Sequence, residues 1–530
     1  MDLPRAHTCP DLMDEMAARF GGRDFVVDHR RRLDYAAFRA EVRALAKGLY
    51  ALGVRRGDKV ALLMGNQAEW LVVDFAVMLL GGVLVALNTW WRREELHHAL
   101  AGTDTSVLVM VDRYLGNDYV AMLGELQPQT TLPQLRTIIG SGESRTPGAI
   151  AYEDVIRRGG EVADATLDAM QHAIAPDDTA MLLFTSGSTA RSKAVRLTHR
   201  DSIVNMHAIG ERMHLTEHDR MLVPTSLFWS LSCLNALFAV MTHGGTLVLL
   251  YRYEAGEMLR LIEAEGCTGA YTLPQIVLQL HAHPDRRQRD LSRWRTGICR
   301  SNMIERMAEI GATEMITGYG LTECYGQSVQ TDGHDPIATR ARNVGRPLPG
   351  VELAIVDPET RERLPDGAVG EIRLRGRVTP GYYRDPERTR ACIDDAGWFY
   401  TGDIGVIEAD GSLTFKGRFK DVIKTGGINV TPADVEDVLL AHPAVEQAVV
   451  VGVPDHEREE IVSAMVVPRT DRSVAVDELL EHCRQAAAAY KVPRFLQIVT
   501  ADEIPLTDTG KVHKANARAL MTERYRMRHG

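Results

Sequence analysis

The hydrophobic residues in the first half of the chain follow two periods, one typical of helices and one typical of buried strands. Apolar residues recur three or four positions apart from Phe38 to Leu52, the spacing of one helix face, and Gly53 ends the run. The next apolar run, residues 60–64, is short and continuous, as in a strand buried on both faces. The same alternation predicts helices at 69–80 and 200–214 and strands at 83–87, 107–111 and 134–139. This pattern indicates parallel sheets flanked by helices.

The alternation continues and then changes twice toward the C-terminus. Strands at 246–250, 268–272 and 314–317 alternate with helices at 256–265, 274–282 and 304–310. Around Val351 the pattern becomes short strands and turns, which predicts a β-rich part at about 345–419. After Lys420 a small α+β unit is predicted, with helices at 432–441 and 474–488 and strands at 445–453 and 461–467. We therefore expect an α/β protein with a large domain at 1–419 and a small C-terminal domain at 420–530.

Composition and charge exclude several classes of protein. The 530 residues are 45% hydrophobic and 25% charged, as in ordinary globular proteins, and the net charge of −10 argues against nucleic-acid binding. The seven cysteines form no Cys-x-x-Cys pair, so their spacing fits reduced thiols and offers no zinc site. Asp74 and Gly81-Gly82 interrupt the most apolar stretch, and the N-terminus has no signal-peptide pattern. The sequence thus predicts a soluble cytoplasmic protein with no membrane span.

A loop rich in hydroxyl groups follows an apolar strand near the middle of the chain. It reads Thr185-Ser186-Gly187-Ser188-Thr189-Ala190-Arg191-Ser192-Lys193, and a second extended segment follows it. Hydroxyls, turn N–H groups and one ammonium can hold phosphates. The spacing of a Walker A loop is absent, and an ordinary surface turn is the alternative interpretation.

Four further stretches carry residues suited to nucleotide chemistry. In Gly318-Tyr319-Gly320-Leu321-Thr322-Glu323 a ring can stack on a base and a carboxylate can hold Mg²⁺. Asp403 on a turn can accept hydrogen bonds from a ribose diol, Arg418 is a fixed cation beside a candidate hinge, and Lys511 follows a glycine turn. Taken singly, Tyr319 could be a core residue, Asp403 a cap, Arg418 a surface ion pair and Lys511 a solvated lysine.

Together, in this order and spacing, the five stretches resemble the adenylate-forming superfamily of acyl- and aryl-CoA synthetases, luciferases and peptide-synthetase adenylation domains. The resemblance extends from about residue 52 to Lys511. It implies an N-terminal domain of two α/β lobes with a β-rich subdomain, and a small mobile C-terminal domain. It also implies ATP, Mg²⁺ and CoA as cofactors.

The resemblance assigns roles to individual residues. The loop from Thr185 to Lys193 is similar to the loop that grips pyrophosphate, Thr185 and Lys193 being catalytic and Ser186, Gly187, Ser188 and Thr189 binding the nucleotide. Tyr319 resembles the residue that stacks on adenine, with Gly320 beside it, Thr322 the residue that contacts phosphate, and Glu323 the catalytic carboxylate associated with Mg²⁺. Asp403 resembles the ribose ligand, Arg418 its partner and Lys511 the catalytic lysine of adenylate formation. Lys420, counted with the nucleotide-binding residues, lies near the family's hinge position. Gly426 and Gly427 resemble residues that border the pantetheine tunnel.

Two parts of the sequence bear on the substrate. Trp229, Ser230 and Cys233 stand where the family places the mouth of the acyl pocket, and Arg300 and Gly318 lie in or after the segment along the acid pocket. Trp229 favours a flat or modest substrate, with a core tryptophan as the alternative. Arg300 could meet a polar or anionic substrate or could face solvent. The loop departs from the family pattern at Ala190, Ser192 and Ala194, and added Cβ atoms restrict positive φ there.

We interpret the chain as an AMP-forming ligase that activates an aryl or medium-chain carboxylic acid as acyl-AMP and transfers it to CoA. Three alternatives remain at this stage. The enzyme could load a carrier protein, it could resemble a diazotase that activates nitrite for an aryl amine, or it could be a binding protein that has lost turnover. The acid, the acceptor and the oligomeric state, with a homodimer left open, are not determined by the sequence.

Overall fold

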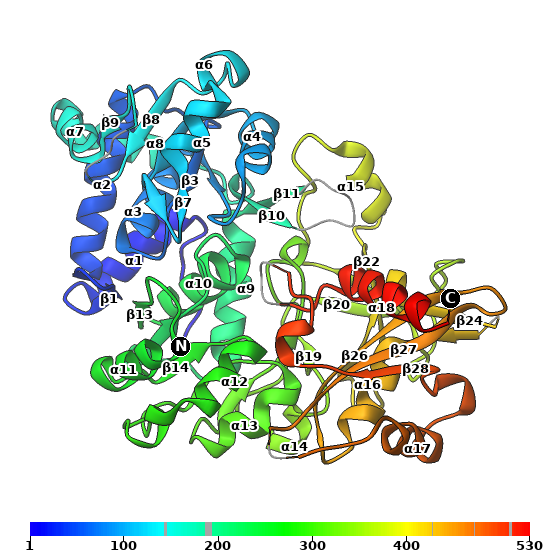
Figure 1. Ribbon diagram of the computed structural model, residues 1–530. Helices are drawn as coiled ribbons and strands as arrows, with labels where there is room; N and C mark the ends of the chain where they lie inside the picture. The colour runs from blue at the N-terminus through cyan, green and yellow to red at the C-terminus, as the bar shows by residue number, and fades with distance from the viewer. Residues whose placement is uncertain (143–145, 186–192, 427, 471, 508–510, 530) are drawn as a thin grey trace. The chain divides into compact units, whose positions relative to one another are not determined.

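The computed structural model describes residues 1–142, 146–185, 193–426, 428–470, 472–507 and 511–529. The chain divides into two compact units (Figure 1). The first comprises Met1–Glu352 and Leu374–Phe399, and the second comprises Leu353–Arg373 and Tyr400–Gly530. The predicted domain boundary at residue 420 stays a prediction.

Two seven-stranded sheets form the framework of the first unit. In spatial order the first sheet contains β16 (Glu314–Ile316), β15 (Thr296–Ile298), β14 (Gly269–Tyr271), β12 (Arg220–Val223), β13 (Thr246–Leu249), β1 (Asp24–Val27) and β2 (Arg32–Asp34). The second contains β11 (Lys193–Thr198), β10 (Thr179–Thr185), β4 (Val83–Ala86), β3 (Lys59–Leu63), β5 (Thr105–Met110), β8 (Thr137–Gly140) and β9 (Ile150–Ala151). The strands are parallel except for the edge pairs β1–β2 and β10–β11, so the predicted parallel sheets are confirmed.

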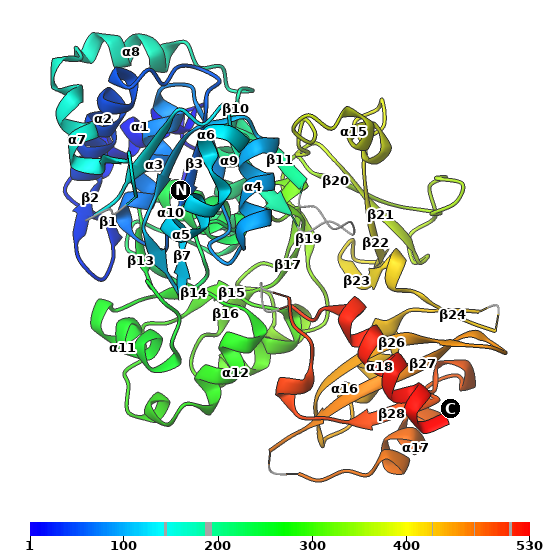
Figure 2. The same cartoon turned by 45° about the horizontal axis from the view of Figure 1, so that its top comes forward.

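Helices cover both faces of these sheets (Figures 1 and 2). The helices of the first unit are α1 (Cys9–Phe20), α2 (Tyr35–Ala51), α3 (Ala68–Leu79), α4 (Arg93–Gly102), α5 (Tyr119–Leu126), α6 (Pro128–Thr131), α7 (Tyr152–Arg158), α8 (Asp164–His172), α9 (His199–Arg212), α10 (Leu237–Met241), α11 (Ala255–Glu265), α12 (Pro274–Ala282), α13 (Ile304–Glu309), α14 (Ile337–Arg340) and α15 (Pro386–Cys392). A π-helical segment, η2 (Ser230–Ala236), runs directly into α10, and 3₁₀ turns occupy η1 (Gly159–Glu161), η3 (Pro284–Arg287), η4 (Ser301–Met303) and η5 (Thr322–Cys324).

The alternation of side chains along the strands assigns each sheet face to a different core. Val60 and Leu62 of β3 belong to the largest cluster of buried residues, whereas Ala61 and Leu63 belong to the cluster that includes α4 and α5. Met221 of β12 likewise faces the largest cluster, whereas Leu222 faces the cluster that includes α11 to α13. The largest cluster also contains α1, α2, α3, α9 and α10, so these helices form a layer between the sheets.

Helix α3 shows why this central layer forms. Ten of the twelve residues in its sequence AEWLVVDFAVML are apolar, and all except Glu69 are buried. A helix that is apolar on every side is stable only where it is enclosed. The helix α2 that packs beside it is capped by Asp34, whose carboxylate accepts a hydrogen bond from the N–H of Ala37.

Three short strands, β17 (Gly318–Tyr319), β18 (Val329–Gln330) and β19 (Arg346–Pro347), form an antiparallel sheet in the first unit, and β6 (Arg113–Tyr114) pairs with β7 (Asn117–Asp118). A four-stranded sheet contains β20 (Glu352–Val356), β21 (Gly370–Arg375), β22 (Phe399–Ile407) and β23 (Leu413–Arg418), as expected for the β-rich part.

The C-terminal part of the second unit is a small α+β fold. Its five-stranded sheet contains β24 (Ile423–Thr425), β25 (Ile428–Val430), β26 (Val445–Asp455), β27 (Glu459–Pro468) and β28 (Phe495–Ile498). The helices are α16 (Pro432–Leu440), α17 (Val476–Ala486) and α18 (Lys514–His529), with 3₁₀ turns η6 (Phe419–Asp421), η7 (Ala489–Lys491) and η8 (Ala501–Glu503). Alternate residues of β26, Val450 on one side and Val449 and Val451 on the other, belong to separate cores. Among the residues that the structure describes, no helix is both long and apolar enough to cross a membrane.

Candidate functional site: a nucleotide and acid site

The predicted phosphate loop connects two strands of an antiparallel pair. Thr185 ends β10 and is paired with Lys193, the first residue of β11. Ser186, Gly187, Ser188 and Thr189, together with Ala190, Arg191 and Ser192, lie outside the described residues. The pairing brings the two ends of the loop together, so Thr185 and Lys193 stand side by side where the loop begins and ends.

A second segment lies along β11. Tyr382 forms an antiparallel bridge with Val195, and the N–H of Tyr383 donates to the carbonyl of Ala194 at 2.9 Å. The Thr379 hydroxyl donates to the Arg196 carbonyl at 2.6 Å. The segment 379–383 therefore continues the sheet edge beside the phosphate loop.

Tyr382 brings a cation and a carboxylate to this edge. The ammonium of Lys193 lies 5.3 Å from the centroid of the Tyr382 ring, and the Tyr382 hydroxyl donates to Oε1 of Glu323 at 2.9 Å. Glu323 is only 6% exposed. Burial, followed by the Glu323 carboxylate, raises the pKa of Tyr382, so its hydroxyl keeps the proton that it donates. The sequence interpretation missed Tyr382, and only the turn signal Pro380-Gly381 lay near it.

The turn that carries Tyr319 and Glu323 is fixed by close packing. A Cβ atom at Gly320 would lie 2.2 Å from the carbonyl oxygen of Gly326, so only glycine fits there. Tyr325 adopts a left-handed conformation with φ of 56°, and its hydroxyl contacts the N–H and the hydroxyl of Thr198. Tyr319 is 7% exposed. The turn is thereby attached to the end of β11.

The Tyr319 turn also meets the predicted acid pocket. The Thr322 hydroxyl donates to Oγ of Ser230 at 3.3 Å. Trp229, half-buried, forms edge-to-face pairs with Trp90 and Phe228 at centroid distances of 5.1 and 5.5 Å. Trp90, which the sequence interpretation missed, also meets Phe228 at 5.5 Å. The structure thus joins an aromatic cluster, defined here as Trp90, Phe228 and Trp229, to the Thr322 motif through Ser230.

The remaining residues of the predicted pocket have different surroundings. Cys233 is wholly buried in η2, and burial raises the pKa of its thiol. Arg300 is exposed and precedes η4, and Gly318 of β17 is paired with Gln330 of β18. A Cβ atom at Gly297 would lie 2.0 Å from the carbonyl oxygen of Ala270, so the strand before Arg300 requires glycine. Pocket roles for Cys233, Arg300 and Gly318 stay predictions.

The second unit places two predicted nucleotide ligands opposite each other. Asp403 and Arg418 are paired residues of the β22–β23 hairpin, and Nε of Arg418 lies 3.5 Å from Oδ1 of Asp403. Asp403 is 5% exposed, whereas the Arg418 side chain is 49% exposed. The ion pair leaves the guanidinium accessible at the edge of the hairpin.

The other predicted residues of the second unit lie on turns. Lys420 is exposed in η6, and Gly426 has φ of 58° with its N–H donating to the Arg458 carbonyl. Gly427 lies outside the described residues. The exposed Lys511 accepts a hydrogen bond from the N–H of Thr507, and its own N–H donates to the Thr507 hydroxyl at 3.1 Å.

Comparisons with known proteins agree with this arrangement. A model of the AMP-binding enzyme family matches residues 13–383, and a model of the AMP-binding enzyme C-terminal domain matches residues 434–511. The chain is 34% identical to a putative acyl-CoA synthetase, YngI, of Bacillus subtilis, over 97% of each protein. It is 32% identical to a mitochondrial medium-chain acyl-CoA ligase, ACSF2, of Danio rerio, over 93% of this chain and 84% of the relative.

A solved structure shows the same fold over nearly the whole chain. The anthranilate CoA ligase AuaEII in complex with anthranoyl-AMP superimposes with a TM-score of 0.87 at 26% identity, covering 99% of each chain. The predicted fold class is therefore confirmed, with both α/β sheets and the C-terminal domain present. The chain belongs to the AMP-binding, adenylate-forming enzymes and is an AMP-forming ligase of the acyl-CoA synthetase type.

Proposed function

We propose that this enzyme activates an aryl or medium-chain carboxylic acid with Mg-ATP and transfers the acyl group to CoA. One observation carries the proposal. The segment 379–383 lies along β11, and its residue Tyr382 contacts both the Glu323 carboxylate and the ammonium of Lys193, the first residue of β11. A carboxylate for a metal and a cation for phosphates thus stand at one sheet edge.

The first half-reaction requires neutralised phosphate charge. The substrate carboxylate attacks the α-phosphorus of ATP, and the bond to the bridging oxygen of pyrophosphate breaks, which leaves acyl-AMP. Lys193 would interact with the departing pyrophosphate, and Thr322 would donate to a phosphate oxygen. Lys511 would place a positive charge beside the α-phosphate. This role follows from its resemblance to the family's catalytic lysine.

Glu323 suits the Mg²⁺ ion that this reaction needs. Mg²⁺ usually binds one or two carboxylates together with substrate phosphates, and the buried Glu323 carboxylate has one oxygen fixed by Tyr382. The ion would supply neutralisation of the charge on the phosphate oxygens. Glu323 would hold it, and Tyr382 would orient Glu323.

The nucleoside contacts follow from the resemblance to the family. Tyr319 would stack on adenine, and the Asp403 carboxylate would accept hydrogen bonds from the ribose hydroxyls while Arg418 stays paired with it. In the second half-reaction the CoA thiolate attacks the acyl carbonyl and AMP leaves. We assign Lys420 to the hinge that separates the half-reactions and Gly426 to the pantetheine path.

The aromatic cluster supports the substrate class. Three rings arranged edge to face form a rigid wall beside Ser230, which is suited to a flat aryl group or a compact alkyl chain. Similar proteins include an anthranilate CoA ligase and a medium-chain acyl-CoA ligase, which supports aryl and medium-chain acids as the two substrate classes.

The test is the release of AMP from Mg-ATP across a panel of aryl and aliphatic acids. Each acid is assayed with CoA, without CoA and, for amino-aryl members, with nitrite in place of CoA. We expect AMP to be released when CoA and an acid of one class are both present. AMP that requires nitrite, or ATP binding without any AMP, would contradict the proposal.

A further inference from the structure

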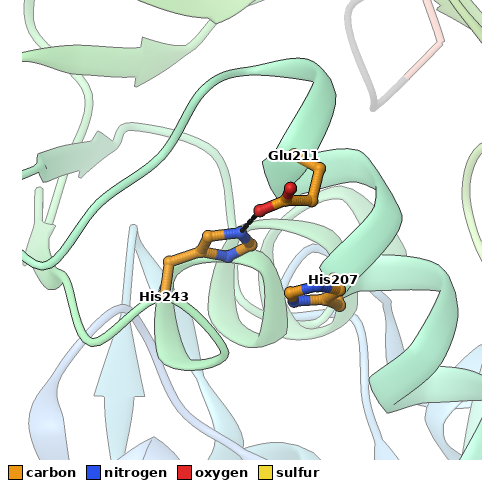
Figure 3. A group of neighbouring side chains, drawn as sticks. All are labelled: His207, Glu211 and His243. Carbon is orange, nitrogen blue, oxygen red and sulfur yellow. Dashed lines mark hydrogen bonds and ion pairs between the residues drawn. The ribbon is translucent and has the colours of Figure 1, made fainter. Parts of the chain in front are cut away.

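A group of three potential metal ligands lies in the first unit, away from the residues assigned above. His207 and Glu211 are one turn apart on α9, and His243 follows α10. One ligand atom from each residue lies within 4.8 Å of the others. Figure 3 shows Glu211 extending from the helix to His243, with the His207 ring beneath the His243 ring.

The backbone of α9 is shaped to receive the His243 ring. A Cβ atom at Gly210 would lie 2.3 Å from Cε1 and 2.6 Å from Nδ1 of His243. The rings of His207 and His243 are nearly parallel, with an angle of 11° and a centroid distance of 4.8 Å. The glycine between His207 and Glu211 therefore allows the second imidazole to lie against the helix.

The hydrogen bonds of His243 leave a lone pair facing a carboxylate. Its Nδ1 lies 2.8 Å from the Ala239 carbonyl oxygen, which can only accept, and 3.1 Å from the Thr242 hydroxyl. That hydroxyl donates to the carbonyls of Phe238 and Ala239, so Nδ1 carries the proton that it shares with Ala239. Its Nε2 lies 3.0 Å from Oε1 of Glu211, which also only accepts. When the ring is neutral with its proton on Nδ1, Nε2 presents a lone pair to the carboxylate, and a cation bound by both atoms takes the place of a proton between them.

His243 is held in a fixed orientation inside the fold. It is wholly buried, with Nδ1 against the Ala239 carbonyl and Nε2 against Glu211. An N–H donated to a backbone carbonyl, with the other nitrogen directed at an ion, is the usual arrangement of a histidine that binds metal.

His207 contributes a buried ring nitrogen, Nδ1, that has no hydrogen-bond partner among the described residues. The residue is 8% exposed. A buried polar atom without a partner destabilises the folded state, so a ligand for this nitrogen would be stabilising.

We propose that His207, Glu211 and His243 form a site for a divalent transition-metal ion of the zinc class. Two imidazoles and one carboxylate are a three-residue ligand set that zinc uses when a further position is open. The Glu211 side chain is 47% exposed, which gives an ion access from solvent. Oε1 of Glu211 also accepts from the amino terminus of Met1 at 2.7 Å, so a bound ion competes with that ammonium.

The proposed ion would connect two elements that lead to the nucleotide and acid site. Helix α9 directly follows β11, which begins at Lys193, and α10 continues η2, which begins at Ser230. An ion at their C-terminal ends would fix α9 against α10 and stabilise the first unit. The role is structural, and no catalytic step is assigned to it.

The test is zinc binding to the full-length protein without an affinity tag. Metal is removed with a chelator, and zinc is then titrated in competition with a chromophoric chelator, with the melting temperature followed in parallel. We expect one ion per chain and a higher melting temperature. Glu211→Gln, at a half-exposed position, and His207→Asn should each weaken binding more than about 100-fold, since even outer partners of a metal ligand contribute about 10–100-fold.

A matched control comes from the other group of this kind among the described residues, His214, Asp332 and His334. His334 is exposed, and His334→Ala should leave zinc affinity and the zinc-induced rise in melting temperature unchanged. Unchanged affinity in Glu211→Gln and His207→Asn, loss of binding in His334→Ala, or no saturable binding by the unmodified chain would each overturn the proposal.

Discussion

Removing the Tyr382 hydroxyl tests whether Glu323 must be oriented for adenylate formation. Tyr382→Phe deletes the 2.9 Å hydrogen bond to Oε1 of Glu323 but keeps the ring beside Lys193. A hydrogen bond to a charged group contributes about 1.5–3 kcal/mol. If that free energy is expressed in the transition state, adenylate formation slows by about 10- to 150-fold, because 1.36 kcal/mol corresponds to about tenfold.

A second substitution separates the hydroxyl from the ring. Tyr382→Leu also removes the cation–π contact with Lys193, which contributes about 0.5–1 kcal/mol and therefore a further factor of about 2–5. Both variants are assayed by ATP–pyrophosphate exchange over a range of Mg²⁺ concentrations, with the melting temperature as a check on folding. The loss should be greatest at limiting Mg²⁺, since Glu323 is the proposed ligand.

The neighbouring tyrosine is a matched control. The hydroxyl of Tyr383 donates to Asp104 at 3.0 Å and not to Glu323, so Tyr383→Phe should exchange pyrophosphate at the normal rate. Normal exchange by Tyr382→Phe at limiting Mg²⁺, or an equal loss in Tyr383→Phe, would refute the reasoning.

Three further predictions concern other parts of the chain. Lys511→Ala should abolish adenylate formation but spare thioester formation from supplied acyl-AMP; equal loss of both half-reactions in a folded protein would contradict the role of Lys511. Trp229→Ala should shift the ratio of kcat/KM toward bulkier acids by about tenfold, and an unchanged ratio would remove Trp229 from the pocket. Asp74, wholly buried, has a pKa raised well above its ordinary value by burial, so the folded state binds a proton that the unfolded chain releases above about pH 4. The contribution of this proton to stability is full below that pH and falls as the pH rises toward the folded pKa, so the unmodified protein loses stability that Asp74→Asn does not lose. The melting temperature of Asp74→Asn minus that of the unmodified protein should therefore rise between about pH 5 and about pH 8. A difference that stays constant with pH would exclude this effect.

Much of the fold was predictable because long buried segments have a clear period. The helix at 69–80 and the strand at 60–64 were predicted within one residue of α3 and β3. Strands β1 and β2 were not predicted, because four- and three-residue segments that include Asp24, Arg32 and Asp34 show no period. The π-helical segment η2 was also not predicted, because the period of a π-helix is neither the 3.6 residues of an α-helix nor the 2 residues of a strand.

The site was predictable where its residues are close in sequence. Tyr319 and Glu323 share one turn, and Asp403 and Arg418 share one hairpin. Tyr382 was missed because its position depends on pairing with Val195 across a large sequence separation, which no local pattern records. His207 and Glu211 have ligand spacing on one helix, but their relation to His243 appears only when α10 packs on α9.

The central claim, that one chain makes an acyl-AMP and passes it to CoA, is tested most directly by a single-turnover experiment. The enzyme is mixed with Mg-ATP and its acid without CoA, and the bound products are identified by mass spectrometry before and after CoA is added. We expect acyl-AMP to accumulate on the enzyme and to be replaced by acyl-CoA and AMP when CoA is supplied. Absence of acyl-AMP, or acyl-AMP that persists in the presence of CoA, would contradict the claim.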